Sequence, residues 1–312
     1  MIEKHIILED IDPVTFYGVN NSHLQMVRSL YPKLRIMARD NVIRVLGDEE
    51  VMCQFEEDME KMRRHIIKYN IISEEDILNI TKGETTKADA AKGVVVYSLS
   101  GKPIRSRSAN QQALVDAFEK KDMVFAVGPA GSGKTYTAIA LAVRALKNKE
   151  VRRIILSRPA VEAGEKMGFL PGEMKDKIDP YLQPLYDALE DMIPAAKLQE
   201  MMEQKVIQIA PLAFMRGRTL NNAVVILDEA QNTTIPQLKM FLTRMGMNTK
   251  MVITGDITQV DLPHSTMSGL VNALNVLKDI KDISFIHMDK DDIVRHKLVT
   301  KIVEAYERTD KN

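Results

Sequence analysis

The sequence predicts an α/β protein in which a mostly parallel sheet, covered by helices on both faces, follows a small α+β domain. Six short apolar runs recur between residues 123 and 287, and segments with helical periodicity separate most of them. Strands that alternate with helices in this way build parallel sheets. No internal repeat of 20 to 50 residues is present, which excludes a solenoid. The runs are Met123–Val127, Arg153–Ser157, Val206–Ile209, Ala223–Leu227, Met251–Thr254 and Ile283–His287.

The first 80 residues predict a small domain with the order strand, helix, helix, strand, strand, helix. Ser22 is a suitable N-cap for the second helix, and an acidic first turn suits the start of the last helix. The expected elements are a strand at 5–11, a helix from Pro13 to Gly18, a helix from Ser22, strands at Lys33–Ala38 and Val42–Leu46, and a helix at Asp48–Tyr69. The polar segment 81–92, TKGETTKADAAK, predicts a linker. Residues 93–312 then form the second domain, which opens with a hairpin turning at Ser100 and Gly101.

Composition narrows the classes of function. The chain has 312 residues with 43 basic and 43 acidic side chains, so no overall positive field points to nucleic acid. The single cysteine, Cys53, excludes an intramolecular disulfide and a cysteine-rich zinc site, and it fits a reducing compartment. The six histidines show no metal-ligand spacing. The apolar run near the N-terminus is too short for a signal peptide or a membrane span, so we expect a soluble, cytoplasmic protein.

The stretch GPAGSGKT, residues 128–135, predicts a phosphate-binding loop. It matches the Walker A pattern GxxxxGK[ST] and lies between a predicted strand and a predicted helix, as that pattern requires. Backbone N–H groups of such a loop cradle phosphates, the lysine reaches the β and γ phosphates, and the threonine hydroxyl binds Mg²⁺. A glycine-rich turn with a chance lysine does not account for this context. The predicted nucleotide-binding residues are Gly128, Pro129, Ala130, Gly131, Ser132, Gly133, Lys134, Thr135 and Tyr136.

Two later strands end in polar side chains that suit the same chemistry. AVVILDEAQN places Asp228 and Glu229 at the carboxyl end of a strand, where open α/β sheets bind ligands. Asp228 would join Thr135 as a magnesium ligand, and Glu229 would polarise a water for attack on the γ phosphate. The alternative is that both acids cap the following helix. After the next strand, Gln259 is placed to sense the γ phosphate or the water, and the alternative there is an ordinary turn capped by Asp256.

These motifs resemble the PhoH family of phosphate-loop ATPases. The resemblance covers about residues 93–307, and it implies a RecA-like fold similar to the first motor domain of superfamily 1 helicases. It also implies ATP hydrolysis coupled to RNA, with Gln111 or Gln112 reading adenine and Gln259 sensing the γ phosphate. The matching stretches are NQQ (110–112), GPAGSGKTY, SRPAVEAGEKMGFLPGEMKDKIDPYLQPLYDAL (157–189), FMRGRTL (214–220), ILDEAQN, TGDITQVDLP and VRHKLVTKIVEAYE.

The N-terminal domain, with its order of elements, resembles a KH-type RNA-binding module. Such a module clamps nucleotides with a GxxG loop between its first two helices. The corresponding loop here is GVNN, residues 18–21, which lacks the second glycine. The alternative is a small domain that contacts proteins, because fold alone does not fix function.

Basic residues outside the phosphate loop complete the set of candidates. Prolines and glycines predict that much of residues 158–189 is not regular helix, and Arg158 and Lys166 in it are candidates for nucleic-acid contact. About 25 residues follow the last predicted strand in this sequence, too few for a second motor domain. A transition-state arginine would therefore come from the same domain or from a neighbouring subunit, which predicts a homo-oligomer such as a hexameric ring. The candidates for this arginine are Arg216, Arg218 and Arg295.

Two functions remain open on the sequence alone. The first is an ATPase with ATP and Mg²⁺ that remodels or processes RNA, which extends to RNA helicase activity and, through the family resemblance, to rRNA and ribosome maturation. The second is a nucleotide-gated scaffold for an RNA-processing endonuclease or a ribosome-associated protein, in which hydrolysis only resets the complex. A kinase is disfavoured because nothing in the sequence resembles an acceptor pocket.

Overall fold

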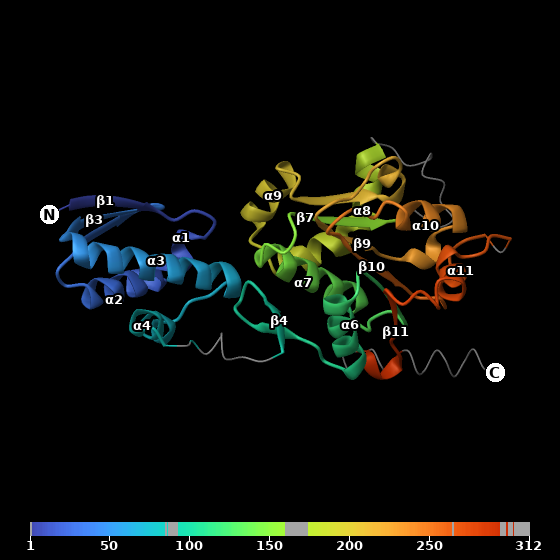
Figure 1. Ribbon diagram of the computed structural model, residues 1–312, viewed down its shortest axis with the longest axis horizontal. Helices are drawn as coiled ribbons and strands as arrows, with labels where there is room; N and C mark the ends of the chain where they lie inside the picture. The colour runs from blue at the N-terminus through green and yellow to red at the C-terminus, as the bar shows by residue number, and fades with distance from the viewer. Residues whose placement is uncertain are drawn as a thin grey trace. The chain divides into compact units, whose positions relative to one another are not determined.

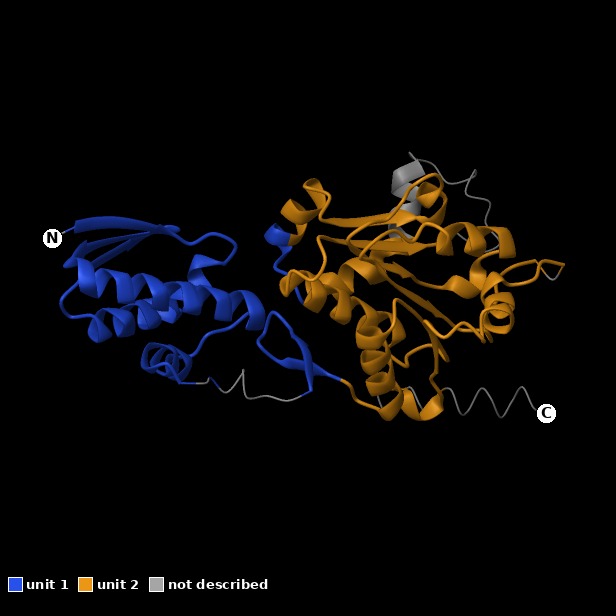
Figure 2. Ribbon diagram, in the orientation of Figure 1, with its two compact units in different colours: residues 1–105, 191–197 blue, residues 106–190, 198–312 orange. Residues whose placement is uncertain are grey.

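The chain divides into two compact units in the computed structural model. The model describes residues 2–84, 86, 93–159, 174–263 and 265–293 together with residues 298 and 302, and the side chains of 174–180 lie outside this description. The first unit comprises residues 1–105 and 191–197, and the second comprises residues 106–190 and 198–312 (Figure 2). The first unit therefore runs on to Arg105 and includes the hairpin that the sequence analysis assigned to the second domain.

The first unit has the predicted order of elements and one additional helix. Its three strands form an antiparallel sheet in the order β1-β3-β2. Strand β1 lies at residues 2–7, earlier than the predicted 5–11, because its register pairs Ile2 with Gly47 and Ile7 with Val42. The elements are β1 Ile2–Ile7, α1 Pro13–Tyr17, η1 Val19–Asn21, α2 Ser22–Leu30, β2 Arg35–Arg39, β3 Val42–Gly47, α3 Glu49–Tyr69, α4 Glu74–Lys82, β4 Val94–Tyr97 and β5 Pro103–Arg105.

Two local features of this unit differ from the prediction. Ser22 is the first residue of α2 and not its N-cap, which is Asn21 in a left-handed conformation. Helix α4 was missed, and it overlaps the start of the predicted linker. It is defined by a capping box between Ser73 and Asp76 and by the left-handed Gly83 at its end. Most of the remaining linker, residues 85 and 87–92, lies outside the described residues.

The second unit is built on a six-stranded sheet whose strands are all parallel, which confirms the predicted fold class (Figure 1). The order is β11-β6-β10-β9-β7-β8, and every predicted strand is present within a few residues of its predicted bounds. The strands are β6 Met123–Val127, β7 Arg153–Arg158, β8 Ile207–Pro211, β9 Ala223–Leu227, β10 Lys250–Gly255 and β11 Ile283–His287. The helices are α6 Ala109–Lys120, α7 Lys134–Lys147, α8 Met174–Glu190, α9 Ala195–Glu203, η3 Leu212–Met215, η4 Ala230–Asn232, α10 Ile235–Leu242, α11 Gly269–Val276 and η5 Lys290–Asp292.

Helices bury both faces of this sheet. All residues of β6 and β9 are buried, as strands covered on both sides require. Helix α7 packs across β7, β9 and β10, whereas α10, α11 and η3 pack on a core formed by alternate residues such as Phe125, Val225 and Ile253. No helix in the described part of the chain has the length and apolar composition needed to cross a membrane.

Helix α8 corrects the expectation for the segment after β7. The prolines and glycines predicted that much of residues 158–189 is not regular helix, yet α8 begins at Met174 and continues through Pro180 and Pro184. Its buried leucines, Leu182, Leu185 and Leu189, recur at helical spacing, and their packing offsets the backbone bonds that proline removes. Residues 160–173, which include Lys166, lie outside the described residues.

Candidate nucleotide site

The carboxyl ends of the parallel strands bring the predicted motifs to one edge of the sheet. Strand β6 leads into the loop 128–133, and α7 begins at Lys134 directly after it. Gly131 and Gly133 have φ values of 83° and 79°, a region that favours glycine. At Gly128, a Cβ atom would collide with the backbone carbonyl oxygen of Met288, so the close approach of two chain segments requires glycine there.

The Lys134 side chain is folded over the phosphate loop. Its Nζ donates to the carbonyl oxygen of Gly128 at 2.6 Å and to that of Pro129 at 2.8 Å. Burial lowers the pKa of Lys134, and the carboxylates of Asp256, Glu229 and Asp228 act in the opposite direction. A bound phosphate would place a negative charge beside this buried ammonium group. It would also accept the hydrogen bonds that Lys134 now donates to the loop carbonyl oxygens.

Thr135 and Asp228 are brought together as the magnesium prediction requires. Thr135 Oγ1 donates to Asp228 Oδ1 at 2.6 Å, and Thr254 Oγ1 from β10 donates to the same oxygen at 2.7 Å. Asp228 is 5% exposed. A hydroxyl and a carboxylate at this separation could hold Mg²⁺, which takes one or two protein oxygens and completes its shell with water and phosphate. No cluster of three or more His, Cys, Asp or Glu side chains suited to a metal occurs among the described residues.

Glu229 is held from both sides in an unusual backbone conformation. Its φ is 53°, which is left-handed and costly for a residue other than glycine. Its Oε1 accepts from Arg158 Nη2 at 3.2 Å, and its Oε2 accepts from Gln231 Nε2 at 2.5 Å. Glu229 makes no side-chain cap bond to η4, and α10 is capped by Thr234. The capping alternative is therefore wrong for Glu229.

The Arg158 side chain, a candidate for nucleic-acid contact, lies beside the two acids of this site. Its Nε is 3.9 Å from Asp228 Oδ2, and its Nη1 donates to the carbonyl oxygen of Tyr181 in α8 at 2.9 Å. The side chain is 21% exposed. Arg158 therefore links both acids to α8.

Gln231 is the residue that sequence reasoning missed. Its side chain is 1% exposed, and its amide group makes hydrogen bonds to Glu229, Asp256 and Gln259. Besides Glu229, its Nε2 reaches the carbonyl oxygen of Gln259 at 3.2 Å, and its Oε1 accepts from the backbone N–H of Asp256 at 3.0 Å. The stretch DEAQN contains this residue, but its spacing alone does not show which way the side chain points.

Asp256 contacts the phosphate loop and also binds the side chain of Gln259. Asp256 Oδ2 accepts from the backbone N–H of Ala130 at 3.1 Å and from Gln259 Nε2 at 3.0 Å. Asp256 Oδ1 accepts from the backbone and hydroxyl of Thr258, so this segment is also the local turn that the alternative predicted. The two interpretations are compatible, because the turn places the Gln259 side chain on Asp256, which itself binds the loop.

The two adjacent glutamines of α6 differ completely in environment. Gln111 is 5% exposed, donates through Nε2 to the carbonyl oxygen of Ser132 at 2.9 Å, and accepts from the backbone N–H of Arg107 at 2.8 Å. Gln112 is exposed and bonds Asp116. Gln111 is therefore the glutamine beside the phosphate loop. Tyr136, in the first turn of α7, is partly buried.

The candidate transition-state arginines are not gathered at the site. Arg218 Nη2 donates to Gln208 of β8 at 2.6 Å, and Arg216 is exposed on the preceding turn. Strand β8 is the outermost strand, separated by β7 from the strand that carries Asp228. Arg295 and most of VRHKLVTKIVEAYE lie outside the described residues.

Comparison with known proteins places the same motifs in one family. A family model described as "PhoH-like protein" matches residues 103–307. A PhoH-like protein of Bacillus subtilis (strain 168) is 46% identical over 302 residues, 95% of this chain and 94% of that protein. A PhoH-like protein of Mycobacterium bovis is 56% identical over 216 residues, 69% of this chain and 61% of that protein. A Pif1 helicase from Candida albicans aligns with a TM-score of 0.34 at 13% identity over 63% of this chain and 42% of that chain, a likeness too low to support an inference about function.

Proposed function

Because the chain belongs to the PhoH-like protein family, we propose that it binds ATP with Mg²⁺ and hydrolyses the γ phosphate. One observation carries the proposal. The Thr135 hydroxyl and the Asp228 carboxylate share a hydrogen bond at the mouth of the phosphate loop, and the next residue, Glu229, presents a second carboxylate that Arg158 and Gln231 hold in place. Two neighbouring acids with different partners suit two different tasks.

Each side chain has a role that its geometry supports. The loop N–H groups and Lys134 bind the phosphates and neutralise charge that develops on the γ phosphoryl group. Thr135 and Asp228 would hold the magnesium ion, which would supply positive charge to stabilise the phosphates. Glu229 accepts the proton of the attacking water, and Gln259, fixed by Asp256, senses the γ phosphate. Gln111 reads the adenine from its position beside Ser132.

We further propose that hydrolysis is coupled to RNA remodelling or processing in the cytoplasm. The first unit supports this proposal through a groove between α1, α2 and β2, lined by residues that include Tyr17, Leu24 and Arg28. The loop that lacks the second glycine of a KH module holds Asn20 and Asn21 at φ 54° and 60°. Asparagine tolerates this conformation better than most residues, so the loop adopts backbone geometry that glycine would otherwise supply.

We also propose a ring of subunits in which a neighbour supplies the transition-state arginine. Arg218 is the weakest of the three candidates, because its guanidinium is bound to Gln208. Mixing Arg295→Ala chains with Glu229→Gln chains should restore part of the turnover that each variant lacks alone. A fully active monomer, measured by light scattering during turnover, would refute the ring.

The central experiment compares Glu229→Gln with the parent in ATP binding and ATP turnover. We expect the variant to bind ATP and to turn it over at least 100-fold more slowly, since general bases contribute on this order. Glu150→Gln, which changes an exposed glutamate bonded to Asn148, is the matched control. Equal turnover in Glu229→Gln and parent would overturn the proposed chemistry.

The same preparation separates the motor from the scaffold. Turnover measured with and without single-stranded RNA, followed by a duplex-unwinding assay, should show stimulation by RNA. If the rate of ATP turnover does not change with RNA but does change with an added RNA-processing protein, the nucleotide-gated scaffold is established instead.

A further inference from the structure

We infer that the turn after β8 is a binding site for single-stranded RNA, in which Phe214 stacks on a base and Arg216 binds the adjacent phosphate. This inference rests on the proposed RNA-coupled function and names a surface that carries the coupling. The turn comprises residues 212–219, between the end of β8 at Pro211 and the return of the chain toward β9.

One side of the turn is buried in the core, and the other side is exposed to solvent. Leu212 and Met215 are 3% and 0% exposed and belong to the core under α10. Phe214, between them, is 60% exposed. The turn is thus anchored by two neighbours while it presents an aromatic ring to solvent. Bases of single-stranded nucleic acid stack on exposed aromatic side chains of this kind.

The sequence segment that contains the turn carries more cations than acids, although the whole chain is neutral, and two of its cations, Lys205 and Lys250, lie at the amino ends of their strands. Residues 204–255 contain only two acids, Asp228 and Glu229, and both belong to the nucleotide site. The same stretch contains six cations, namely Lys205, Arg216, Arg218, Lys239, Arg244 and Lys250. Locally uncompensated cations attract a polyanion even where net charge is zero.

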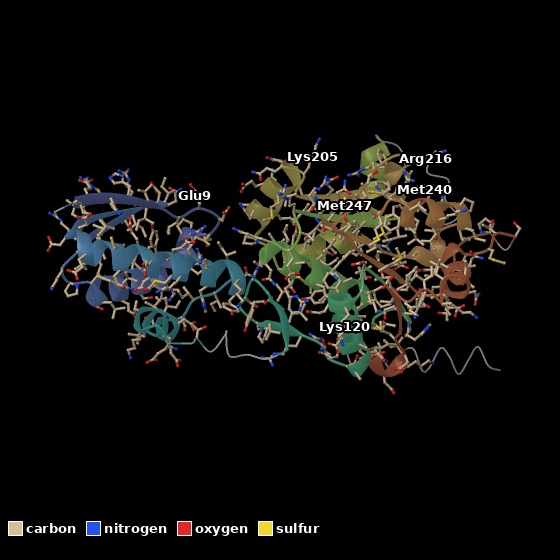
Figure 3. The ribbon with its side chains drawn as sticks, in the orientation of Figure 1. Glu9, Lys120, Lys205, Arg216, Met240 and Met247 are labelled. Atoms are coloured by element: carbon tan, nitrogen blue, oxygen red, sulfur yellow. The ribbon has the colours of Figure 1, made fainter. Side chains whose placement is uncertain are left out.

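Arg216 is the cation best placed to act beside Phe214. Within the part of the chain that the structure describes, its side chain makes no hydrogen bond or ion pair, whereas Arg218 bonds Gln208 and Arg244 bonds backbone carbonyl oxygens of Met240 and Arg218. Arg216 and Lys205 lie at opposite ends of β8, and Arg216 is at the carboxyl end (Figure 3). Gly217, at φ 75° with open space around it, lets the chain turn directly after Arg216.

The position of the turn connects it to the nucleotide site. Strands β8, β7 and β9 are consecutive and parallel, so their carboxyl ends share one edge. Two strand spacings amount to about 10 Å. Arg158, which bonds Glu229, lies at the end of the intervening strand. A strand of RNA seated on Phe214 and crossing this edge would pass the residue that holds the catalytic acid.

The occupant that these features favour is single-stranded RNA. A base can stack on an aromatic ring only where it is unpaired, so a duplex would use the cations without the ring. A protein interface needs a contiguous surface of about 800 Å² per partner with an apolar centre. The residues that follow Phe214 at the surface are instead Arg216, Gly217, Arg218 and Thr219.

The test measures binding of a fluorescein-labelled 12-nucleotide oligouridine to the full chain by anisotropy. We expect Phe214→Ala to weaken binding about tenfold and Phe214→Trp to restore it, because stacking depends on the ring. Arg216→Ala should reduce the slope of log affinity against log salt by about 1. Met247→Ala removes an apolar side chain elsewhere that is 79% exposed, more than Phe214, and should change nothing. A blunt-ended RNA duplex, which offers no unpaired bases, should bind with an affinity that Phe214→Ala does not alter.

Failure of this inference is distinguishable from failure of the proposed function. If the parent binds the oligonucleotide and Phe214→Ala binds it equally well, the site is elsewhere and RNA coupling stands. If the parent neither binds RNA nor responds to it in turnover, the RNA coupling itself is wrong. A change of molecular mass in Phe214→Ala without loss of RNA affinity would identify the turn as a contact between copies of the chain. Restoration of turnover when Arg216→Ala and Glu229→Gln chains are mixed would assign Arg216 to a neighbour's nucleotide, and this also overturns the inference.

Discussion

Gln231 should control catalysis without controlling nucleotide binding. Replacing it with leucine keeps a side chain of similar size and removes the hydrogen bonds that its amide group makes to Glu229, Asp256 and Gln259. The Asp256 N–H would then be buried without its acceptor, at a cost of about 1–3 kcal/mol. The bond to the Glu229 carboxylate is charge-assisted, and losing it removes roughly another 1.5–3 kcal/mol in the folded state. Because such terms overlap, we expect the second unit to lose about 2–4 kcal/mol of unfolding free energy.

The catalytic effect follows from the freedom that Glu229 gains. Only Arg158 would still orient its carboxylate, so we expect kcat to fall about 10- to 100-fold, equivalent to roughly 1.4–2.8 kcal/mol in the barrier. KM for ATP should stay within about threefold of the parent, because Gln231 makes no recorded contact to Lys134 or to the phosphate loop. The assay is steady-state phosphate release, with urea unfolding to confirm the fold. Gln183→Leu, which removes an exposed glutamine bonded to Asp187, is the control. A folded Gln231→Leu protein with kcat within twofold of the parent would refute the reasoning.

Three further predictions concern other parts of the molecule. Gln111→Leu should weaken ATP binding about tenfold in a fluorescent-nucleotide titration, whereas Gln112→Leu should leave it unchanged, since only the first glutamine contacts the loop. Gly128→Ala should lower both the melting temperature and ATP affinity, because the new Cβ would collide with a backbone carbonyl oxygen just beyond β11; normal values of both would contradict this. Burial acts to raise the pKa of Asp58, but hydrogen bonds, the first from Tyr31, outweigh it and hold the pKa below its usual value. Its ionised form therefore stabilises the fold above about pH 4, and this stability is lost as pH falls through the lower folded-state pKa. Asp58→Asn should flatten that acid limb in urea unfolding measured from pH 3 to pH 7, and an unchanged limb would show that other groups produce it.

Arg158 and Gln231, which hold the Glu229 carboxylate, connect it to other elements of the fold. Arg158 bonds both the acid and the backbone of α8, and Gln231 bonds both the acid and the segment that carries Gln259. Movement of either element would change the orientation of the carboxylate. The backbone of Glu229 is itself in the left-handed region, at φ 53°, which is costly for a residue other than glycine.

The sequence by itself determined the fold class, the strands of the large sheet and the position of the phosphate loop. These features are local, because hydrophobic periodicity reports which short segments are buried and the Walker A pattern carries its own strand and helix. The tertiary structure decided which glutamine faces the loop, where the Arg158 side chain points, and that Gln231 joins Glu229 to Gln259. Each of these depends on the direction of a side chain and on partners distant in the chain, such as Arg158 and Glu229, which are 71 positions apart. Helix α8 shows the same limit for the backbone, since the packing of its leucines against the sheet outweighs the prolines that locally oppose a helix.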